Sequence, residues 1–305
     1  MIFNKTGKLI RCNFKYKNMN INTVREYKYL GFMITPSGEI TTGLKDLKNR
    51  ALRAVNILRS KMGEYFRNDV TTTLKLFNAM IRPILLYMSD FWGNLKMPLN
   101  NPIEVCHMKF LKQLLGVQVQ TTNIRVLLET GEIPISIEAK KISLKNWERI
   151  RSKKCNPLLQ ISYDNALQEN LVWLNRIKEE LSSIGLGNLY ESGDGGIAEE
   201  FLQRQTDIFH QNAFAGINRE NSKLRTYSTL KTEIGKEKYL TEIHNIKNRI
   251  ALTKIRLSNH TLMIEKGRHL NIHKTKRICN FCPNVEDEFH FVIECKTYSA
   301  IRSQL

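Results

Sequence analysis

The stretch ITTGLKDLKNRALRAVNILRSKMGEYF, from Ile40 to Phe66, has the clearest helical periodicity in this sequence. Its apolar residues follow i, i+3, i+4 spacing and form one stripe, which comprises Leu44, Leu47, Ala51, Val55, Leu58, Met62 and Tyr65. Such a stripe predicts an amphipathic helix that buries one face. Basic residues flank the stripe: Lys45, Lys48 and Arg59 lie along one edge, and Arg50, Arg53 and Lys61 lie on the far side.

The residues before this stretch have a different character. Short pieces rich in β-branched and aromatic residues alternate with turn residues, up to a stop at Thr35-Pro36-Ser37-Gly38. This pattern predicts strands or hairpins. A few short strands bury little surface by themselves, so we expect the edge of a sheet whose remainder lies outside this chain.

The residues after Phe66 predict further helices. One starts near Asp69–Thr71, and Pro83 kinks or divides it because proline lacks the backbone N–H. Others run from Asn101-Pro102 to Gly116, from Thr122 to Glu129 and from Pro134 to about Arg151. The chain from Pro157 to about Asn221 is predicted to be helical in short pieces.

A long helix is predicted from about Lys236 to Ser258. Its apolar residues Ile243, Ile246, Ile250 and Leu257 are expected to face inward. Arg249 and Arg256 stand one heptad apart and are expected on the opposite side.

Three cysteines and a histidine near the end of the chain form the pattern C-x2-C-x7-H-x4-C. These residues are Cys279, Cys282, His290 and Cys295. Three thiolates and one imidazole complete a tetrahedral shell around Zn²⁺ and leave no position for water, which predicts a structural zinc knuckle. Phe281, Phe289 and Phe291 either cover this site or stack on bases.

A dense basic run precedes this motif. It contains Arg249, Lys254, Arg256, Lys266, Arg268, Lys274, Lys276 and Arg277, with Glu265 as the one carboxylate among them. A stiffened loop beside such a run is typical of proteins that grip a phosphate backbone. The alternative is a solvated helix face followed by a basic linker. Because Glu286, Asp287 and Glu288 would repel phosphate, we expect the basic run rather than the knuckle tip to make the contact.

The composition supports a polyanionic partner. Lys and Arg total 47 against 29 Asp and Glu, which gives a net charge of +18. Six cysteines are too few for a disulfide scaffold, and no apolar stretch is long enough for a transmembrane helix or a signal peptide. We therefore expect an intracellular protein of the cytoplasm, the nucleus or both.

No catalytic residues are predicted. The aspartates are widely scattered, so no pair marks a Mg²⁺ site, and no phosphate-binding loop, HExxH or GxSxG motif occurs.

Several motifs in order resemble the C-terminal part of non-LTR (LINE-type) retrotransposon reverse transcriptases. They are YKYLGFMI at 27–34, RPILLY at 82–87, FWG at 91–93, FLKQLLGV at 110–117, ETGEIP at 129–134, Trp147, KIRLSNH at 254–260, GRH at 267–269 and the cysteine motif. In that family the polymerase palm, with its paired aspartates, is followed by a helical thumb that holds template and primer, and then by a helical region with a CCHC motif. The resemblance therefore implies that the basic residues along the 40–66 helix line the backbone of a nucleic-acid duplex without reading its sequence; they are Lys45, Lys48, Arg50, Arg53, Arg59 and Lys61.

The residue patterns above predict a mainly α fold with a small N-terminal β-hairpin region. Together with the resemblance, they indicate four segments. They are residues 1–39, an edge remnant of the palm; 40–153, a thumb-like helical bundle; 154–258, a helical middle region; and 259–305, the basic segment with the zinc knuckle. The catalytic aspartates of the family would lie upstream of Met1, so the chain is expected to be a fragment that is no enzyme on its own.

These observations leave three functional hypotheses. The first is a nucleic-acid-binding fragment that grips template RNA or an RNA–DNA hybrid. The second is a structural or protein-interaction module that packs against a separate palm-containing polymerase chain. The third is an RNA-directed DNA polymerase that is active only as part of a longer chain.

Overall fold

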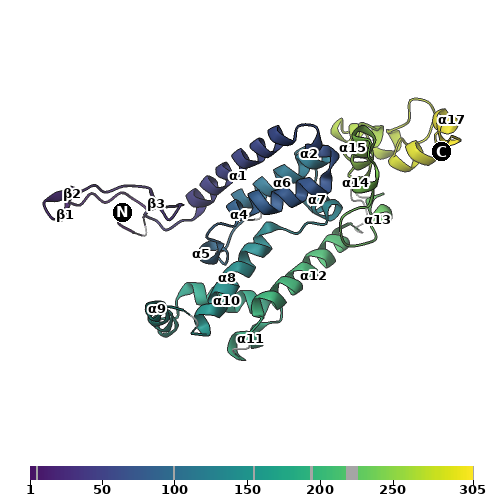
Figure 1. Ribbon diagram of the computed structural model, residues 1–305. Helices are drawn as coiled ribbons and strands as arrows, with labels where there is room; N and C mark the ends of the chain where they lie inside the picture. Colours follow the sequence, from purple (N-terminus) through teal and green to yellow (C-terminus); the bar gives the residue numbers. More distant parts are fainter. Residues whose placement is uncertain (5, 99, 154, 193–194, 218–225, 305) are drawn as a thin grey trace. The chain divides into compact units, whose positions relative to one another are not determined.

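The computed structural model describes all residues except 5, 99, 154, 193–194, 218–225 and 305 (Figure 1). The described chain is mainly α-helical, with two small β-hairpins near its N-terminus and a Cys/His cluster near its C-terminus. This confirms the predicted fold class. None of the described helices is both long enough and apolar enough to cross a membrane.

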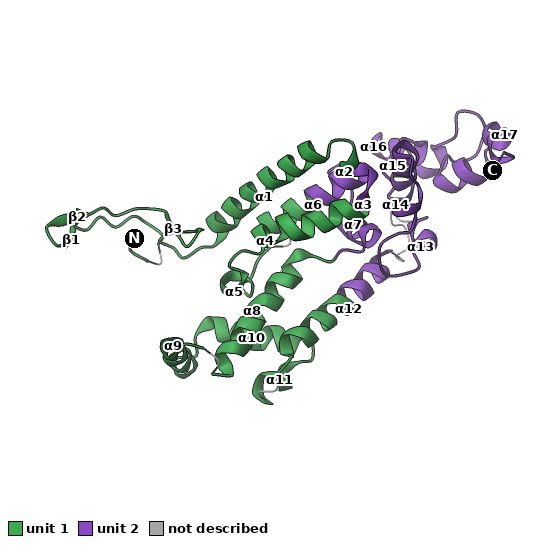
Figure 2. Ribbon diagram, viewed as in Figure 1, with its two compact units in different colours: residues 1–66, 71–108, 133–208 green, residues 67–70, 109–132, 209–305 purple. Residues whose placement is uncertain are grey.

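The chain forms two compact units (Figure 2). Unit 1 contains residues 1–66, 71–108 and 133–208, and unit 2 contains residues 67–70, 109–132 and 209–305. Each unit therefore combines segments that are distant in the sequence, whereas the four expected segments are consecutive. The four-segment division stays a prediction, and Lys154 at one of its boundaries lies outside the described residues.

Unit 1 begins with the two hairpins. Strand β1 (Phe14–Tyr16) pairs with β2 (Met19–Ile21), and β3 (Tyr27–Tyr29) pairs with β4 (Phe32–Ile34), both antiparallel. Leu30 and Gly31 form the tight loop between β3 and β4, with φ angles of 45° and 85°. Positive φ at both loop positions matches the twist of a two-residue hairpin, and glycine adopts it without strain.

Helix α1 (Thr41–Met62) follows the hairpins and confirms the predicted apolar stripe. Its buried residues include Leu44, Leu47, Ala51, Val55 and Leu58. Tyr65 was expected in the same stripe, and this is wrong. The helix ends at Gly63, and Tyr65 opens the short helix α2 (Tyr65–Asn68) with 71% of its surface exposed.

The segment around Pro83 is divided as expected. Helix α3 (Val70–Leu76) passes into a π-helical turn η1 (Phe77–Ile81), then into α4 (Arg82–Leu85) and α5 (Ser89–Trp92). The missing N–H of Pro83 removes one helical hydrogen bond, which explains the change of helix type just before it. In unit 1, α4 packs on α1, and α5 packs on α8 (Ile135–Arg151).

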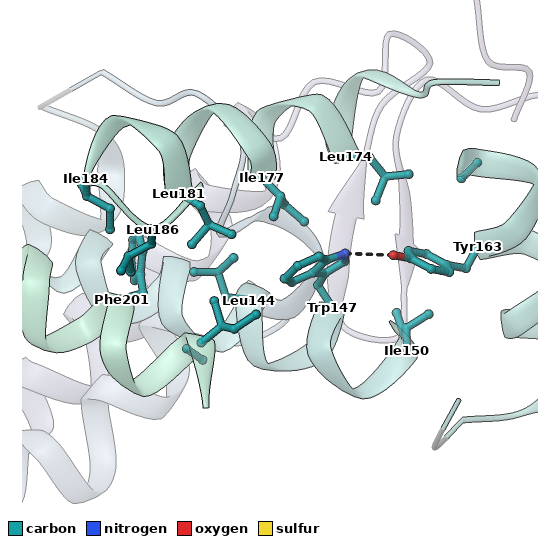
Figure 3. Close-up of a cluster of buried hydrophobic side chains, with 13 residues drawn as sticks. Leu144, Trp147, Ile150, Tyr163, Leu174, Ile177, Leu181, Ile184, Leu186 and Phe201 are labelled. Carbon is teal, nitrogen blue, oxygen red and sulfur yellow. Dashed lines mark hydrogen bonds between the residues drawn. The ribbon is translucent and has the colours of Figure 1, made fainter. Parts of the chain in front are cut away.

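An apolar cluster lies between α8 and four later helices: α9 (Pro157–Gln168), α10 (Val172–Ser183), α11 (Gly187–Ser192) and α12 (Ile197–Ile217). Figure 3 shows Trp147 of α8 at its centre, with the indole N–H donating to the Tyr163 hydroxyl at 3.3 Å. Leu144, Leu181 and Phe201 are completely buried in the same cluster. Short helical pieces were predicted here, and this holds for α9, α10 and α11 but is wrong for α12, which is a single helix of 21 residues. Asn221, at the end of the predicted region, lies outside the described residues.

Helix α6 (Pro102–Leu115) contributes residues to both units, and α7 (Asn123–Thr130) lies in unit 2. The side chain of Asn101 accepts hydrogen bonds from the Ile103 and Glu104 N–H groups, as expected of an N-cap. Unit 2 continues with α13 (Tyr227–Leu230), α14 (Tyr239–Glu242) and α15 (Ile246–Arg256).

The single long helix predicted from Lys236 to Ser258 is wrong in two respects. Lys236 forms an isolated β-bridge with Thr130, and an extended Ile243 separates α14 from α15, where Asn245 caps a new helix. The inward face is also different in part: Leu257 is buried as predicted, but Ile243, Ile246 and Ile250 are only half-buried, and Arg249, Thr253 and Arg256 are the buried residues of α15. Apolar periodicity failed here because the buried arginines have polar partners elsewhere in unit 2.

Candidate metal centre and nucleic-acid interface

The four predicted metal ligands come from two local structures in the C-terminal part of unit 2. Cys279 and Cys282 lie in a tight hairpin turn that is closed by a β-bridge between Ile278 and Val285. The Cys279 N–H donates to the Asn284 carbonyl at 2.9 Å, and the Glu286 N–H donates to the Arg277 carbonyl at 2.9 Å. These bonds fix the turn, so that both sulfurs face the same point.

The other two ligands lie at the ends of a π-helical turn, η3 (His290–Glu294). The Asp287 carboxylate accepts from the His290 N–H at 2.8 Å and caps the start of this turn. The Cys295 N–H donates to the His290 carbonyl at 2.8 Å, which brings the thiol back beside the imidazole.

The ligand atoms of Cys279, Cys282, His290 and Cys295 all lie within 4.8 Å of one another. The Cys282 sulfur is 3.1 Å from His290 Nε2 and 3.9 Å from the Cys295 sulfur. A tetrahedral ion with metal–sulfur bonds of about 2.3 Å places two sulfurs about 3.8 Å apart. The described residues therefore confirm a cluster close enough to hold a metal ion.

The acidity of the thiols reflects their crowding. Burial raises the pKa of the Cys282 thiol to about 11, and the neighbouring Cys279 and Cys295 thiols add to the shift. Burial acts in the same direction on Cys295, but hydrogen bonds from Thr297 outweigh it and lower its pKa to about 7. A bound cation would favour thiolates at every position, so metal binding is coupled to proton release.

Acidic residues around the cluster have internal partners. The Glu286 carboxylate accepts from the Met263 N–H at 2.6 Å, at the start of helix α16 (Met263–His269). Glu288 is 3% exposed and lies 2.8 Å from the ring of His260. The Glu294 carboxylate lies 3.5 Å from Nδ1 of His290, the position that orients many metal-bound histidines. The acidic run that was expected to repel phosphate therefore holds this part of the chain together.

Two of the predicted nucleic-acid contacts, Arg249 and Arg256, are buried. The guanidinium of Arg249 donates to the carbonyls of Arg67, Asn68 and Ile243. Arg256 lies between Glu129 and Glu237, with nitrogen–oxygen distances of 2.8 and 2.7 Å. Their expected position on the outer face is wrong, since both guanidiniums are occupied inside unit 2.

The remaining basic residues of this region differ in exposure. Lys274 and Lys276 are exposed in a 3-10 turn, η2 (Lys274–Lys276). Arg277 is half-buried and donates to the carbonyls of Ile264 and Ile272. Arg268 pairs with Glu265 at 2.9 Å, and Lys254 is half-buried. Lys266 in α16 is also exposed. Lys266, Lys274 and Lys276 are therefore the residues of this set that are open to a phosphate backbone, and the last two lie nearest to the metal cluster in the sequence.

The basic residues of α1 divide in the same way. Lys45, Arg53, Arg59 and Lys61 are exposed, and Lys48 is half-buried. Arg50 donates to the Gly31 carbonyl at 2.8 Å and lies 3.1 Å from Asp46, so it fastens the β3–β4 loop to the helix. Whether these residues contact nucleic acid stays a prediction.

A buried ionic network in unit 2 had no counterpart among the sequence predictions. Besides the two carboxylates on Arg256, Lys231 lies 2.6 Å from Glu237 and also donates to the Gly235 carbonyl. Glu129 is completely buried, and its burial raises its pKa while Arg256 acts in the opposite direction. Charged residues at inward-facing positions of α7 and α15 could have indicated a buried ion pair in the sequence. The partners could not be identified, because Glu129 and Arg256 are about 130 positions apart.

Comparisons with known proteins give no relative. No protein-family model matches the sequence, and no curated protein and no solved structure is similar to it.

Proposed function

We propose that this protein binds nucleic acid through its basic tail, residues 259–304, and that a zinc ion holds this tail in shape. The main support for this proposal is the position of Lys274 and Lys276, which are exposed in a turn that ends just before the metal cluster. Arg277 ties this turn to α16 through two carbonyls, and the Ile278–Val285 bridge ties it to the cysteine hairpin. These hydrogen bonds hold the backbone of the turn that carries the two lysines.

The donor set supports zinc as the metal. Three thiols and one imidazole provide soft and borderline ligands for tetrahedral coordination, and four protein ligands leave no open position. The ion would stabilise the fold of the tail rather than activate a substrate. Such a site needs reduced thiols, which supports a reducing cytoplasmic or nuclear compartment.

A second set of phosphate contacts is proposed on α1. Lys45, Arg53, Arg59 and Lys61 are exposed on a helix whose opposite stripe is buried, so they are available to a duplex backbone. Backbone contacts of this kind position a nucleic acid without reading its sequence.

The wider proposal rests on the resemblance to LINE-type reverse transcriptases. On that view the chain is the thumb and C-terminal part of such a protein, its ligand is template RNA or an RNA–DNA hybrid, and the polymerase chemistry belongs to a palm in a longer chain. Purified chain given primer–template, dNTPs and Mg²⁺ should extend no primer. Extension would refute this assignment of the chemistry.

The binding proposal is tested by measuring the affinity for a structured RNA at rising salt. Lys274→Ala with Lys276→Ala should weaken binding and reduce the slope of log K against log salt by about 1.4 to 1.8, since each lost phosphate contact contributes about 0.7 to 0.9. The matched control is Lys96→Ala with Lys153→Ala, which removes two exposed lysines of unit 1. A flat salt dependence, or equal effects of the two pairs, would contradict the proposal.

The N-terminal hairpins favour the second candidate, a module that packs against a separate palm-containing chain. All six residues of β1 and β2 are exposed, and their pairing register puts Phe14, Tyr16, Met19 and Ile21 on one face. An isolated two-stranded hairpin with an open apolar face gains little stability by itself, so a covering partner would explain it. A monomer that has no affinity for RNA but associates with a palm-containing polymerase chain would support this candidate.

A further inference from the structure

The aromatic residues around the metal cluster do not share one environment. Phe291 packs against Tyr298 with ring centroids 5.0 Å apart. Phe281 is 63% exposed and meets Tyr298 only edge-on at 6.4 Å, and Phe289 is 55% exposed. Phe291 is thus packed within the tail, whereas the rings of Phe281 and Phe289 are largely exposed to solvent.

The two exposed rings are positioned by the metal ligands. Phe281 directly precedes Cys282, and Phe289 directly precedes His290. The ligand atoms of Cys282 and His290 are 3.1 Å apart, so the backbone segments that carry the rings converge on one point. A metal ion would lock both segments, which lowers the entropy that the rings lose when they bind a ligand.

The charges nearby favour a polyanion over an apolar protein surface. Lys274 and Lys276 are exposed in the turn before Cys279. The carboxylate of Glu288 is buried against His260, and the half-buried carboxylates of Glu286 and Asp287 accept hydrogen bonds from the Met263 and His290 N–H groups, so all three are engaged within the tail. Exposed aromatic rings and exposed lysines in one short segment are typical of proteins that bind single-stranded nucleic acid, since every unpaired base offers a face for stacking.

We propose that Phe281 and Phe289 stack on unpaired bases, so that the tail prefers single-stranded RNA or DNA to a duplex. This inference rests on the proposed nucleic-acid binding and specifies its substrate. The lysines contribute backbone attraction to any nucleic acid, whereas the rings contribute only where bases are unstacked. The preference for single strands should therefore depend on the rings alone.

The experiment uses the full, zinc-loaded chain and three labelled probes: a 20-nucleotide RNA without self-complementarity, DNA of the same sequence, and the 20-base-pair duplex DNA. Affinities are measured by fluorescence anisotropy. Phe281→Leu with Phe289→Leu keeps the apolar volume but removes the rings. It should weaken single-strand binding roughly 25-fold, taking about fivefold for each base from the lower end of measured stacking effects.

Three comparisons make the test specific. The same leucine pair should bind the duplex within about twofold of the unchanged protein, because a duplex offers no unpaired base to the rings. Phe281→Tyr with Phe289→Tyr retains the rings and should bind single strands normally. Ile301→Ala removes an exposed apolar side chain of the same tail and should have no effect.

The loss on either single strand, RNA or DNA, supports the proposal. Single-strand affinity that survives the leucine pair would overturn it, as would equal affinity of the unchanged protein for single strands and duplex. If the exposed rings bind a protein instead of bases, single-strand affinity would survive the leucine pair. If Lys274→Ala with Lys276→Ala weakens binding while the leucine pair does not, the stacking inference alone fails. If neither pair has an effect, the proposed function fails as well.

Discussion

Arg256→Met removes the cation that lies between two carboxylates inside unit 2. Arg256 is 7% exposed, Glu129 is completely buried, and the guanidinium lies 2.8 Å from Glu129 and 2.7 Å from Glu237. Methionine has a similar volume, so the main loss is electrostatic. Breaking a buried ion pair by removing one partner costs about 3 to 5 kcal/mol, because the remaining charge stays buried. Unit 2 should therefore be destabilised by an amount in this range.

The loss of unfolding free energy caused by Arg256→Met should depend on pH. Burial raises the pKa of Glu129 above its ordinary value of 4.5, and Arg256 opposes the rise. A carboxyl whose folded pKa is raised contributes stability that is fully present below the unfolded pKa and is lost as pH rises through the folded pKa. Without Arg256 the folded pKa rises further, so the deficit of the variant should be larger at pH 8 than at pH 5.

Hydrogen exchange of α7 and α15 measures this loss within unit 2. A loss of 3 kcal/mol corresponds to exchange that is roughly 150-fold faster. Tryptophan fluorescence follows unit 1 separately, because Trp92, Trp147 and Trp173 all belong to that unit. The matched control is Lys247→Met, an exposed position of the same helix. A deficit below about 1 kcal/mol, or one that is equal at both pH values, would show that Arg256 does not neutralise a buried Glu129 carboxylate.

Three further predictions concern other parts of the chain. Cys282→Ser should reduce bound zinc below one equivalent and speed hydrogen exchange in the tail, and unchanged metal content would show that this thiol is no ligand. Trp147→Ala should lower the free energy of unfolding of unit 1 by about 3 to 5 kcal/mol in urea titrations, because the ring is 2% exposed at the centre of a core, and a loss under 1 kcal/mol would contradict that packing. Gly43→Ala should cost about 1 to 3 kcal/mol in thermal melts, since a Cβ there would lie 2.3 Å from the Phe32 ring, whereas Gly216→Ala, where a Cβ meets nothing within 4 Å, should be neutral or stabilising. Equal effects of the two alanines would be inconsistent with the described contact.

Local patterns in the sequence predicted the parts of the fold that depend on neighbouring residues. The stripe of Leu44, Leu47 and Ala51 predicted α1, and Asn101 with Pro102 predicted the start of α6. The C-x2-C-x7-H-x4-C spacing predicted the metal cluster, because each ligand pair is placed by a short turn of its own.

Features that depend on distant partners were not predicted. Apolar periodicity placed Arg249 and Arg256 on the outer face of the helix. Both guanidiniums are instead buried, because the carbonyls of residues 67 and 68 accept hydrogen bonds from Arg249 and the carboxylate of Glu129 pairs with Arg256. The same limit applies to Glu286 and Glu288, whose charges were expected to repel phosphate at the knuckle tip and whose hydrogen bonds with Met263 and His260 were not predicted. Sequence spacing alone does not show which buried charge meets which partner.

The central proposal is that nucleic-acid binding depends on the metal centre, because a bound ion would fix the tail that carries Lys274, Lys276 and the exposed rings. The most direct test compares single-stranded RNA affinity of the full chain before chelation, after chelation and after Zn²⁺ is restored. Chelation should weaken binding at least about tenfold, because a disordered tail must be ordered when it binds, and zinc should restore the affinity. Affinity that stays the same without the metal would contradict this dependence.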